Sequence, residues 1–374
     1  MADIPNSIFR CFSSLRDPRR SRREKKHLLL DIVAIALCAV IAGAKDWPEV
    51  VAFGERRLDW LQTFLSLPGG IPSRSTFERV FAALSPCGLQ SCLLRWLHGC
   101  TGQLELQHIA IDGKTLRHSG NRHKGLGALH LVSAWATQAH LSLGQVAVAD
   151  KSNEITAIPV LLSMLDIKGA LVTIDAMGCQ KKIAKQIVDA GGDYVLTVKA
   201  NQPGLYDDIL ESFQQAYEVE FEGYDCDHYQ TEERGHGRHE TRSYRVLYNL
   251  EGIKDRAEWE KLTVIGVCHS VRTVGDKISE ETRYFIGSRR ASARVYGEAL
   301  RGHWGIENNL HWQLDVAFGE DDSSIQQRNI GQNMALLRKW VLSLLKRHTG
   351  KHSIKVKQFM AALDTGYLEE ILNS

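Results

Sequence analysis

Three acidic residues that lie far apart in the chain, Asp112, Asp175 and Glu307, have the surroundings expected of a metal-binding site. Asp112 and Asp175 each stand where an apolar run ends and a small residue follows. Glu307 lies in the segment 299–315, which we predict to be a helix because its apolar and polar residues recur at helical spacing. If the fold brings the two strand ends against this helix, the three carboxylates form a site for a divalent metal ion.

The chemistry of such a site is phosphoryl transfer. Carboxylate oxygens are hard ligands that suit Mg²⁺ or Mn²⁺. Two such ions, about 4 Å apart, activate the attacking oxygen and stabilise the leaving oxygen of an in-line displacement. Asp112 would bridge both ions, Asp175 would hold one and Glu307 the other. A single Asp at the end of a strand is often only a turn former or a helix cap, so the hypothesis depends on all three acids together.

The predicted helix has two other interpretations. Helical spacing puts His303, Glu307, His311 and Asp315 on one face, and a polar ladder of this kind is also typical of a solvent-exposed helix face. His303, Glu307 and His311 could alternatively bind zinc, which imidazole and carboxylate both suit. The HExxH order of a zinc hydrolase is absent.

The elements that must position these acids follow from the apolar patterns between residues 104 and 202. We predict strands that are mostly joined by hairpins or helices, and we expect Gly113 to end the first one. The predicted strands are 108–112, 129–137, 141–149, 170–175 and 194–198, and the predicted helices are 155–165 and 180–190. This order is that of an RNase H-like mixed sheet of the α/β class. Residues from about 203 to about 288 are acidic and turn-rich, and they predict a β-rich insertion before the last core helix.

The first hundred residues read as helical throughout. The apolar run 27–44 is predicted to be a buried helix, because Asp31 interrupts it and the uncharged part is shorter than the ~20 residues that span a bilayer. Further on, Ser75 and Glu78 have the spacing of a capping box that opens a short helix. Helix, turn and capped helix resemble a helix-turn-helix DNA reader, with Arg74 and Arg79 as the candidate contacts, although ordinary helix packing produces the same pattern.

The length of the chain and the distribution of its charges indicate how it is organised. The chain has 374 residues, of which 44% are apolar and 24% charged. A chain of this length is too long for one compact core. We expect a helical N-terminal domain (1–100), a catalytic core (104–348) and a helical C-terminal tail (349–374). Lys and Arg (46) nearly balance Asp and Glu (44), but basic residues crowd the segment 19–26, which suits contact with a polyanion. The cysteines show no paired framework, so we expect a reduced, cytoplasmic protein.

Longer strings of the sequence resemble a known family over nearly the whole chain. They are IAIDGKTLRHS (109–119), KSNEITAIP (151–159), TIDAMGCQ (173–180), GGDYVLTVKANQ (191–202), HWGIENNLHWQLDV (303–316) and EDD (320–322). These strings are similar to those of the H-repeat-associated proteins, which belong to the ISAs-type group of bacterial insertion-sequence transposases with a DDE catalytic triad. The resemblance extends to a helical N-terminal domain.

The resemblance implies what the three acids do. It places Asp112, Asp175 and Glu307 at the catalytic and metal-binding positions, with Mg²⁺ as the cofactor, two ions per site and Mn²⁺ as a substitute. The implied activity is cleavage at the terminal inverted repeats of the element, followed by joining of the freed 3′-hydroxyl to target DNA. It also implies double-stranded DNA as the partner, a homodimer or larger assembly on paired DNA ends, no membrane, and a place in the bacterial cytoplasm with the nucleoid.

The cations that hold DNA near Glu307 do not follow from the resemblance. Related transposases often carry Tyr, Arg and Lys around the glutamate, where this chain has Leu300, His303 and Leu314. The candidate DNA contacts near the acids are therefore chosen from the surrounding motifs. They are Lys114, Arg117, Lys199, Asn201, His303 and His311.

Three functions stay open on the sequence. The first is an active DDE transposase, which the presence of all three acids favours. The second is a degenerate transposase-like protein that binds DNA without moving it. The third is an RNase H-like nuclease without strand transfer, against which the separate N-terminal domain argues.

Overall fold

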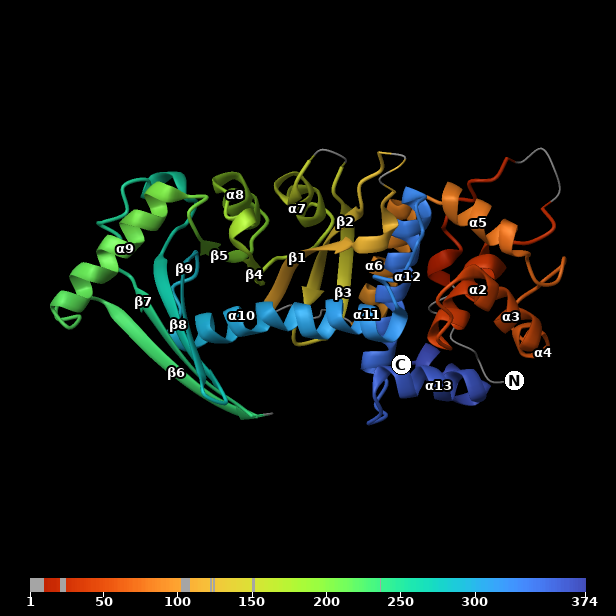
Figure 1. Cartoon of the computed structure of the whole chain (residues 1–374). Coiled ribbons are helices and arrows are strands. Elements are labelled where there is room, and N and C mark those ends of the chain that lie inside the picture. Colours follow the sequence, from red (N-terminus) through yellow and green to blue (C-terminus); the bar gives the residue numbers. More distant parts are fainter. Residues whose placement is uncertain are drawn as a thin grey trace.

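The fold is organised around one mixed β-sheet (Figure 1). The computed structural model describes residues 10–20, 25–101, 108–121, 123, 125–149, 152–235 and 237–374. Its strands form a nine-stranded sheet in the order β3-β2-β1-β4-β5-β9-β8-β7-β6. The first part of this order, β3-β2-β1-β4-β5, is the RNase H-like arrangement predicted from the apolar patterns.

The RNase H-like strands are close to their predicted positions. They are β1 (His108–Leu116), β2 (Leu129–Ala136), β3 (Leu141–Ala147), β4 (Leu171–Ile174) and β5 (Asp193–Val198). β1 pairs antiparallel with β2 and parallel with β4, and β4 pairs parallel with β5. The expectation that Gly113 ends the first strand is wrong, because Gly113 pairs with Val132 and the ladder continues to Leu116.

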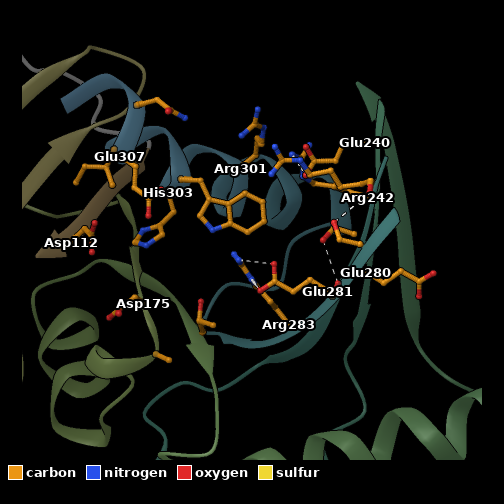
Figure 2. A pocket seen from close by; sticks show the side chains of 18 of the residues that line it. Asp112, Asp175, Glu240, Arg242, Glu280, Glu281, Arg283, Arg301, His303 and Glu307 are labelled. Carbon is orange, nitrogen blue, oxygen red and sulfur yellow. Dashed lines mark hydrogen bonds and ion pairs between the residues drawn. The ribbon is translucent and has the colours of Figure 1, made fainter. Parts of the chain in front are cut away.

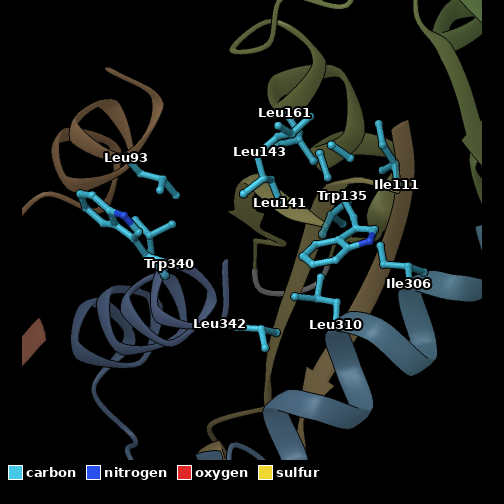
Figure 3. Close-up of a cluster of buried hydrophobic side chains, with 14 of the residues drawn as sticks. Leu93, Ile111, Trp135, Leu141, Leu143, Leu161, Ile306, Leu310, Trp340 and Leu342 are labelled. Atoms are coloured by element: carbon cyan, nitrogen blue, oxygen red, sulfur yellow. The ribbon is translucent and has the colours of Figure 1, made fainter. Parts of the chain in front are cut away.

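Helices cover both faces of these strands. Figure 1 shows α7 (Glu154–Leu162) and α8 (Lys181–Asp189) above them, and α10 (Ala293–Ile306) with α11 (Trp312–Phe318) below. On the lower side, Ile306 and Leu310 pack beside Trp135 of β2 (Figure 3). Burial of a large apolar side chain stabilises a fold by about 1.5–3 kcal/mol. These buried side chains therefore hold the long helix against the sheet.

The β-rich insertion continues the core sheet instead of forming a separate layer. It begins with α9 (Pro203–Glu218) and contains β6 (Cys226–Gly235), β7 (Arg238–Leu247), β8 (Val264–Val274) and β9 (Lys277–Gly287). β9 pairs antiparallel with β5, with Leu196 opposite Ile286. The insertion therefore has a fixed place beside the strands that carry the acids.

The N-terminal helices are α2 (Leu29–Ile41), α3 (Trp47–Arg56), α4 (Leu58–Leu61), α5 (Arg74–Ala83) and α6 (Pro86–Thr101). Almost every residue of α2 is buried, which agrees with its apolar composition on all sides. The predicted capping box is wrong: α5 begins after Ser73, whose extended backbone makes it the N-cap, and Glu78 instead binds Arg74 at 2.8 Å. The helix starts earlier than expected.

A long helix, α12 (Arg328–Arg347), joins the N-terminal helices to the core. Trp340 of α12 lies beside Leu93 of α6, and Leu342 faces the sheet (Figure 3). α12 also packs against α2, α5 and β3. The C-terminal tail forms α13 (Ile354–Leu363) and α14 (Thr365–Leu372), and the Trp60 indole donates to Glu369 of α14 at 2.6 Å. The N- and C-terminal helices thus share one hydrophobic core with the sheet.

No single helix among the described residues is both long and apolar enough to cross a bilayer. Taken together, Arg74–Ala83 and Pro86–Leu97 have the length and apolar composition of a span, but the two helices are bent by 89°.

A buried amide on α12 should be important for stability. Asn333 is fully buried, and its Nδ2 donates to the carbonyl oxygens of Phe81 (2.9 Å) and Leu84 (3.0 Å) at the end of α5. Asn333→Ala leaves both carbonyls buried and unpaired, so we expect the free energy of unfolding to fall by about 2 kcal/mol in urea titrations. Asn329→Ala, one turn earlier and half-buried with one bond to Ala82, is the matched control and should cost less than about 1 kcal/mol. Equal losses for the two variants would contradict this assignment.

Candidate active site

The two aspartates reach the same point of the sheet because of strand register. In the parallel pair of β1 and β4, Ile111 lies opposite Ile174. Asp112 and Asp175 are the next residues along each strand, so they occupy equivalent positions on neighbouring strands. Residues at equivalent positions emerge on the same face of a sheet, which brings the two carboxylates side by side.

Asp175 is also held by the turn that follows it. Its Oδ1 accepts hydrogen bonds from the backbone N–H groups of Met177 (3.1 Å) and Gly178 (3.3 Å), which open a short 3₁₀ helix. Gly178 is required there, because a Cβ would lie 2.3 Å from the side chain of Ile174. The capping role and a role in the site are therefore compatible, since the cap uses only one carboxylate oxygen.

Glu307 stands at a break in the helical pattern. The segment 293–318 is one long element in which Glu307–His311 forms a π-helical turn between α10 and α11. The predicted single polar face is therefore wrong, because a π turn widens the helix and shifts the register of everything after it. His303 is buried, Glu307 is exposed, and Asp315 binds Lys114. Turns of this type occur frequently at functional sites.

Close contact between the helix and the sheet depends on Gly302. A Cβ at this position would lie 2.8 Å from the ring of His108, the first residue of β1. The sequence marks Gly302 only as a weak helix former, whereas in the structure its missing side chain lets α10 approach the strand that carries Asp112.

The three acids line one cavity of about 500 Å³ (Figure 2). Asp112, Asp175 and Glu307 lie around His303 at one end. The opposite wall belongs to the insertion and to α10, and it is lined by the basic residues Arg238, Arg242, Arg272, Arg283 and Arg301. The insertion side also carries Glu240, Glu280 and Glu281, which the five arginines outnumber. The cavity therefore has an acidic end and, opposite it, a wall that is basic on balance, called the basic wall below.

The acids interact electrostatically. Burial, with the charges of Asp175, Glu154 and Glu307 acting in the same direction, raises the pKa of Asp112 to about 7. Burial and the charge of Glu154 likewise raise the pKa of Asp175. Carboxylates that raise one another's pKa form an electronegative pocket, which a cation would neutralise.

The donor set suits a magnesium-type ion more than zinc. Among the described residues, no three His, Cys, Asp or Glu side chains are arranged to hold a metal ion by themselves. Mg²⁺ is commonly bound through one or two carboxylates together with waters and substrate phosphates, so two neighbouring aspartates and a nearby glutamate have the required chemistry. Zinc needs about three convergent protein ligands, and His303, Glu307 and His311 do not provide that arrangement.

The two histidines of the helix are not cations at neutral pH. Burial lowers the pKa of His303 to about 4, and its Nδ1 lies 3.1 Å from the Thr173 hydroxyl. Burial lowers the pKa of His311 to about 3, and its Nδ1 lies 3.6 Å from Oδ2 of Asp112. Burial therefore works against a positive charge on either imidazole, and contact of His303 and His311 with DNA stays a prediction.

Lys114 and Arg117 are engaged with acids of α11 and of the α11–α12 connection. Lys114 binds Asp315 and lies 3.4 Å from the buried Glu320, and its side chain is 10% exposed. Arg117 is exposed and lies 3.4 Å from Asp321. Lys114 therefore ties β1 to the helix of Glu307, and Arg117 is the more accessible of the two.

Lys199 and Asn201 follow β5 on the side of Asp175. Lys199 is exposed, lines the cavity and lowers the pKa of Asp175 by its charge. The amide of Asn201 donates to the carbonyl oxygen of Ala176 at 2.7 Å, so it supports the turn that holds Asp175.

The described basic residues of the N-terminal part do not line the cavity. Arg74 and Arg79 are exposed on α5, where Arg74 pairs with Glu78 and Arg79 donates to the carbonyl of Ser75. In the early basic segment, Arg19 and Lys25 bind Asp17 at 2.8 and 2.9 Å. Arg22 and Arg23 fall outside the described residues.

Sequence reasoning missed the basic wall. Arg283 and Arg242 lie 4.3 and 5.6 Å from the ring centre of Trp304, and Arg301 forms a two-atom ion pair with Glu233. The alternation of Arg238 and Arg242 along β7 is the one signal that could have indicated a shared face. It could not show that this face is turned toward Glu307.

Sequence comparisons place the chain among transposase-like proteins. Residues 9–97 match a family model described as DDE_Tnp_1-associated, and residues 103–344 match the model described as Transposase DDE domain. The chain is 40% identical over 362 residues to "Putative transposase YncI" of Escherichia coli O157:H7, which covers 95% of this chain and 92% of that protein. It is 38% identical over 353 residues to "H repeat-associated putative transposase YhhI" of Escherichia coli K12, covering 93% of each.

One solved structure can be superposed on most of this chain. It is the cryo-EM structure of the piggyBac transposase synaptic complex with hairpin DNA, which matches with a TM-score of 0.42 and 10% sequence identity. The match covers 98% of this chain and 81% of that chain.

The raised pKa of Asp112 predicts an unusual pH dependence of stability. Between about pH 4 and pH 7 the unfolded chain loses the Asp112 proton while the folded chain keeps it, so the free energy of unfolding falls as pH rises through this window. Asp112→Asn should therefore stabilise the metal-free protein by roughly 1–3 kcal/mol at about pH 8, and by little at about pH 4. Urea titrations at both pH values measure this.

Asp193→Asn is the control of opposite sign. Lys261, Ser288 and Arg289 bind Asp193 and hold its pKa below the usual range. Its ionised form contributes stability above the unfolded pKa, so this variant should be less stable than wild type at about pH 8. Destabilisation by Asp112→Asn at that pH would contradict the account of the site.

Proposed function

The chain belongs to the family of transposases with a DDE domain, and from this premise we propose that it cleaves DNA at the terminal inverted repeats of an insertion sequence and joins the freed 3′-hydroxyl to target DNA. The observation that carries the proposal is the meeting of Asp112, Asp175 and Glu307 at one cavity. Residues separated by long stretches of sequence meet there because β1 and β4 pair in register and α10 crosses them.

In this proposal the three carboxylates hold divalent ions, Mg²⁺ or Mn²⁺. When bound, such ions activate the attacking oxygen and stabilise the leaving oxygen of a phosphodiester. In the first reaction a water oxygen forms the new bond to phosphorus and the bond to the 3′-oxygen breaks, which frees a 3′-hydroxyl. In the second, that hydroxyl attacks a phosphorus of target DNA and displaces its 3′-oxygen.

The surrounding residues would keep the acids in place during both reactions. His311 is neutral and lies against Asp112, so it can orient that carboxylate without adding charge. Lys114, two residues after Asp112, binds Asp315 on the helix of Glu307. A misplacement of about 1 Å can cost about 100-fold in rate, so contacts that fix the helix against β1 matter for catalysis.

DNA is the partner in this proposal. The basic wall faces the acids across the cavity, and Lys199 lines the same space, so phosphates of a strand laid across the carboxylates would meet Arg283, Arg301 and Lys199. Arg74 and Arg79 on the exposed side of α5 are proposed to contact the DNA end, and Arg117 and Asn201 to lie near the cleaved strand. Paired ends would require a homodimer or a larger assembly.

Removing one carboxylate tests the catalytic assignment. Asp112→Asn and Glu307→Gln should each lower cleavage of a DNA end that carries the cognate repeat by roughly 10³-fold or more. DNA affinity should change little, because the acids do not attract phosphates. Cleavage is followed on gels with Mn²⁺ or Mg²⁺, and affinity by fluorescence anisotropy.

Glu298→Gln is the matched control on the same helix, since Glu298 is exposed and pairs with Arg294. It should cleave like wild type. Binding without cleavage by the wild-type protein would instead indicate a degenerate DNA-binding protein, and cleavage without joining would indicate a nuclease.

The basic wall predicts a specific salt dependence. Each Arg that contacts a phosphate releases counterions, so Arg283→Ala combined with Arg301→Ala should make the slope of log affinity against log salt less negative by about two. Arg294→Ala, on the same helix as Arg301 but outside the cavity, is the control and should leave the slope unchanged. Slopes are measured by anisotropy over a series of salt concentrations. An unchanged slope for the double variant would remove the basic wall from the DNA path.

A further inference from the structure

The outer end of the insertion is formed by two neighbouring hairpins. Figure 1 shows strands β6 to β9 continuing past α10 to these hairpin ends at the bottom of the view. The last pairs of the two hairpins are Gly235 with Arg238 and Val274 with Lys277. Because Arg238 also pairs with Val274, the residues Arg238, Val274 and Lys277 form one row across β7, β8 and β9. We call this row the outer row.

The outer row lies on the face of the insertion that lines the cavity. Arg238 and Arg242, at alternate positions of β7, both line the cavity. Residues directly opposite each other on neighbouring strands share a face, so Val274 and Lys277 point to the same side as Arg238. Lys277 precedes Arg283 by six residues along β9, which is about 20 Å of strand. The outer row therefore continues the basic wall outward, away from the three acids.

The cations of the outer end are less neutralised than those near the acids. Three arginines of the inner part bind glutamates at 2.6, 2.7 and 3.1 Å, and they are Arg242, Arg283 and Arg301. Arg238 lies 3.4 Å from Glu240, a carboxylate that it shares with Arg242. Within the part of the chain that the structure describes, Arg272 and Lys277 form no ion pair. The uncompensated positive charge of the wall is therefore concentrated at its outer end.

The alternation of the strands keeps most of the nearby acidic charge off this face. Glu280 lies at the rim of the cavity, but it pairs with Val271 and so belongs to the alternate set of positions on β9. Figure 2 shows its side chain directed away from Arg242 and Arg283. Asp276 lies in the turn between β8 and β9. A face with several cations and one shared glutamate attracts a polyanion.

The spacing of the outer row suits a groove of duplex DNA. Neighbouring strands are about 4.8 Å apart, so the Cα atoms of Arg238 and Lys277 are about 10 Å apart across β8. Val274 lies between them and is 45% exposed. The minor groove is about 6 Å wide with a row of phosphates on each side, and proteins that bind it often insert apolar side chains. Two long cationic side chains on either side of a short apolar one fit this arrangement.

We propose that the outer row, Arg238, Val274 and Lys277, is a second DNA-binding site that contacts the minor groove of the duplex. The two cations bind phosphates on opposite sides of the groove, and Val274 lies in the groove between them. At 3.4 Å per base pair, the contact lies about six base pairs from the phosphate at Arg283. This inference rests on the proposed function, in which DNA lies along the basic wall.

The competing interpretation is a protein contact at the hairpin end. Val274 is not the only exposed apolar residue there, because Ile278 is 67% exposed. Ile278 pairs with Thr273 and therefore lies on the opposite face from the outer row. A protein partner would use the more exposed Ile278, whereas DNA in the cavity would meet Val274 alone. The two interpretations therefore differ in which of these side chains matters.

The first test is the salt dependence of DNA binding by the full chain, measured by anisotropy with a labelled A·T-rich duplex. Arg238→Ala combined with Lys277→Ala should make the slope of log affinity against log salt less negative by about two. The matched control is Arg234→Ala. Arg234 lies at the same end of the insertion but pairs with His239 on the other face, where it is exposed and bound to Glu232. Its removal should leave the slope unchanged.

The second test compares the two apolar side chains. Val274→Ser should weaken binding to the A·T-rich duplex by about threefold, because apolar surface is no longer buried in the groove. The loss should be smaller on a G·C-rich duplex of equal length, since the guanine amino group projects into the minor groove and hinders entry of the side chain. Ile278→Ser is the control and should bind both duplexes as wild type does. Melting temperatures show whether each variant is folded.

The outcomes separate this inference from the proposed function. If Arg283→Ala with Arg301→Ala changes the slope while Arg238→Ala with Lys277→Ala does not, the inference is overturned and the proposed DNA path stands. If wild type binds duplex DNA without salt dependence, the proposed DNA path is itself wrong and the inference falls with it.

The apolar variants decide between DNA and protein. Equal losses of DNA affinity for Val274→Ser and Ile278→Ser, or loss of self-association by Ile278→Ser in sedimentation experiments, would overturn the minor-groove contact. A changed slope for Arg238→Ala with Lys277→Ala, together with a loss of affinity for Val274→Ser alone, supports it.

Discussion

The parallel pairing of β1 with β4 is the interaction on which the rest of the structure depends. It sets Ile111 opposite Ile174 and so places Asp112 beside Asp175. Two carboxylates in such a position repel each other, and burial strengthens the repulsion, which agrees with the raised pKa of Asp112. The apolar ladder of the two strands must therefore hold the acids together against their own charge. A protein keeps such an arrangement at a cost in stability, which is typical of functional sites.

The crossing helix completes the site through small residues and a change of helical pitch. Gly302 lets α10 approach β1, and the π turn at Glu307–His311 redirects the residues that follow. An uninterrupted α-helix would have stacked His303, Glu307, His311 and Asp315 on one face. With the π turn, these residues acquire different partners: the Thr173 hydroxyl, the cavity, Asp112 and Lys114. The four residues therefore have different roles and do not form a single polar face.

Much of this architecture could be predicted from local patterns, and the exceptions have physical causes. Apolar runs that end in Asp112 and Asp175 identified the central strands, since period and length are encoded locally. The pairing of β9 with β5 could not be predicted, because nothing near Leu196 specifies a partner some ninety residues away in the chain. The role of Gly113 was misjudged because a glycine in a strand marks either an end or a close approach. In the structure Gly113 marks a close approach, because a Cβ there would lie 2.0 Å from Oε1 of Glu154.

The insertion and the site are coupled because they share one helix. Trp304, which lies beside Arg242 and Arg283, is three residues before Glu307, so a single helical register places both the ring that these arginines contact and the glutamate. The arginines are not free in this structure: Arg242 binds Glu240, Arg283 binds Glu281, and Arg301 binds Glu233. A phosphate that enters the cavity must therefore replace a carboxylate partner. Since exposed ion pairs contribute only about 0–1 kcal/mol, this exchange costs little for Arg283 and Arg301. For the buried Arg242, whose separation from Glu240 would leave a charge unpaired, the cost is larger. The wall thus combines exchangeable arginines at its surface with a fixed one behind them, and that difference follows from burial alone.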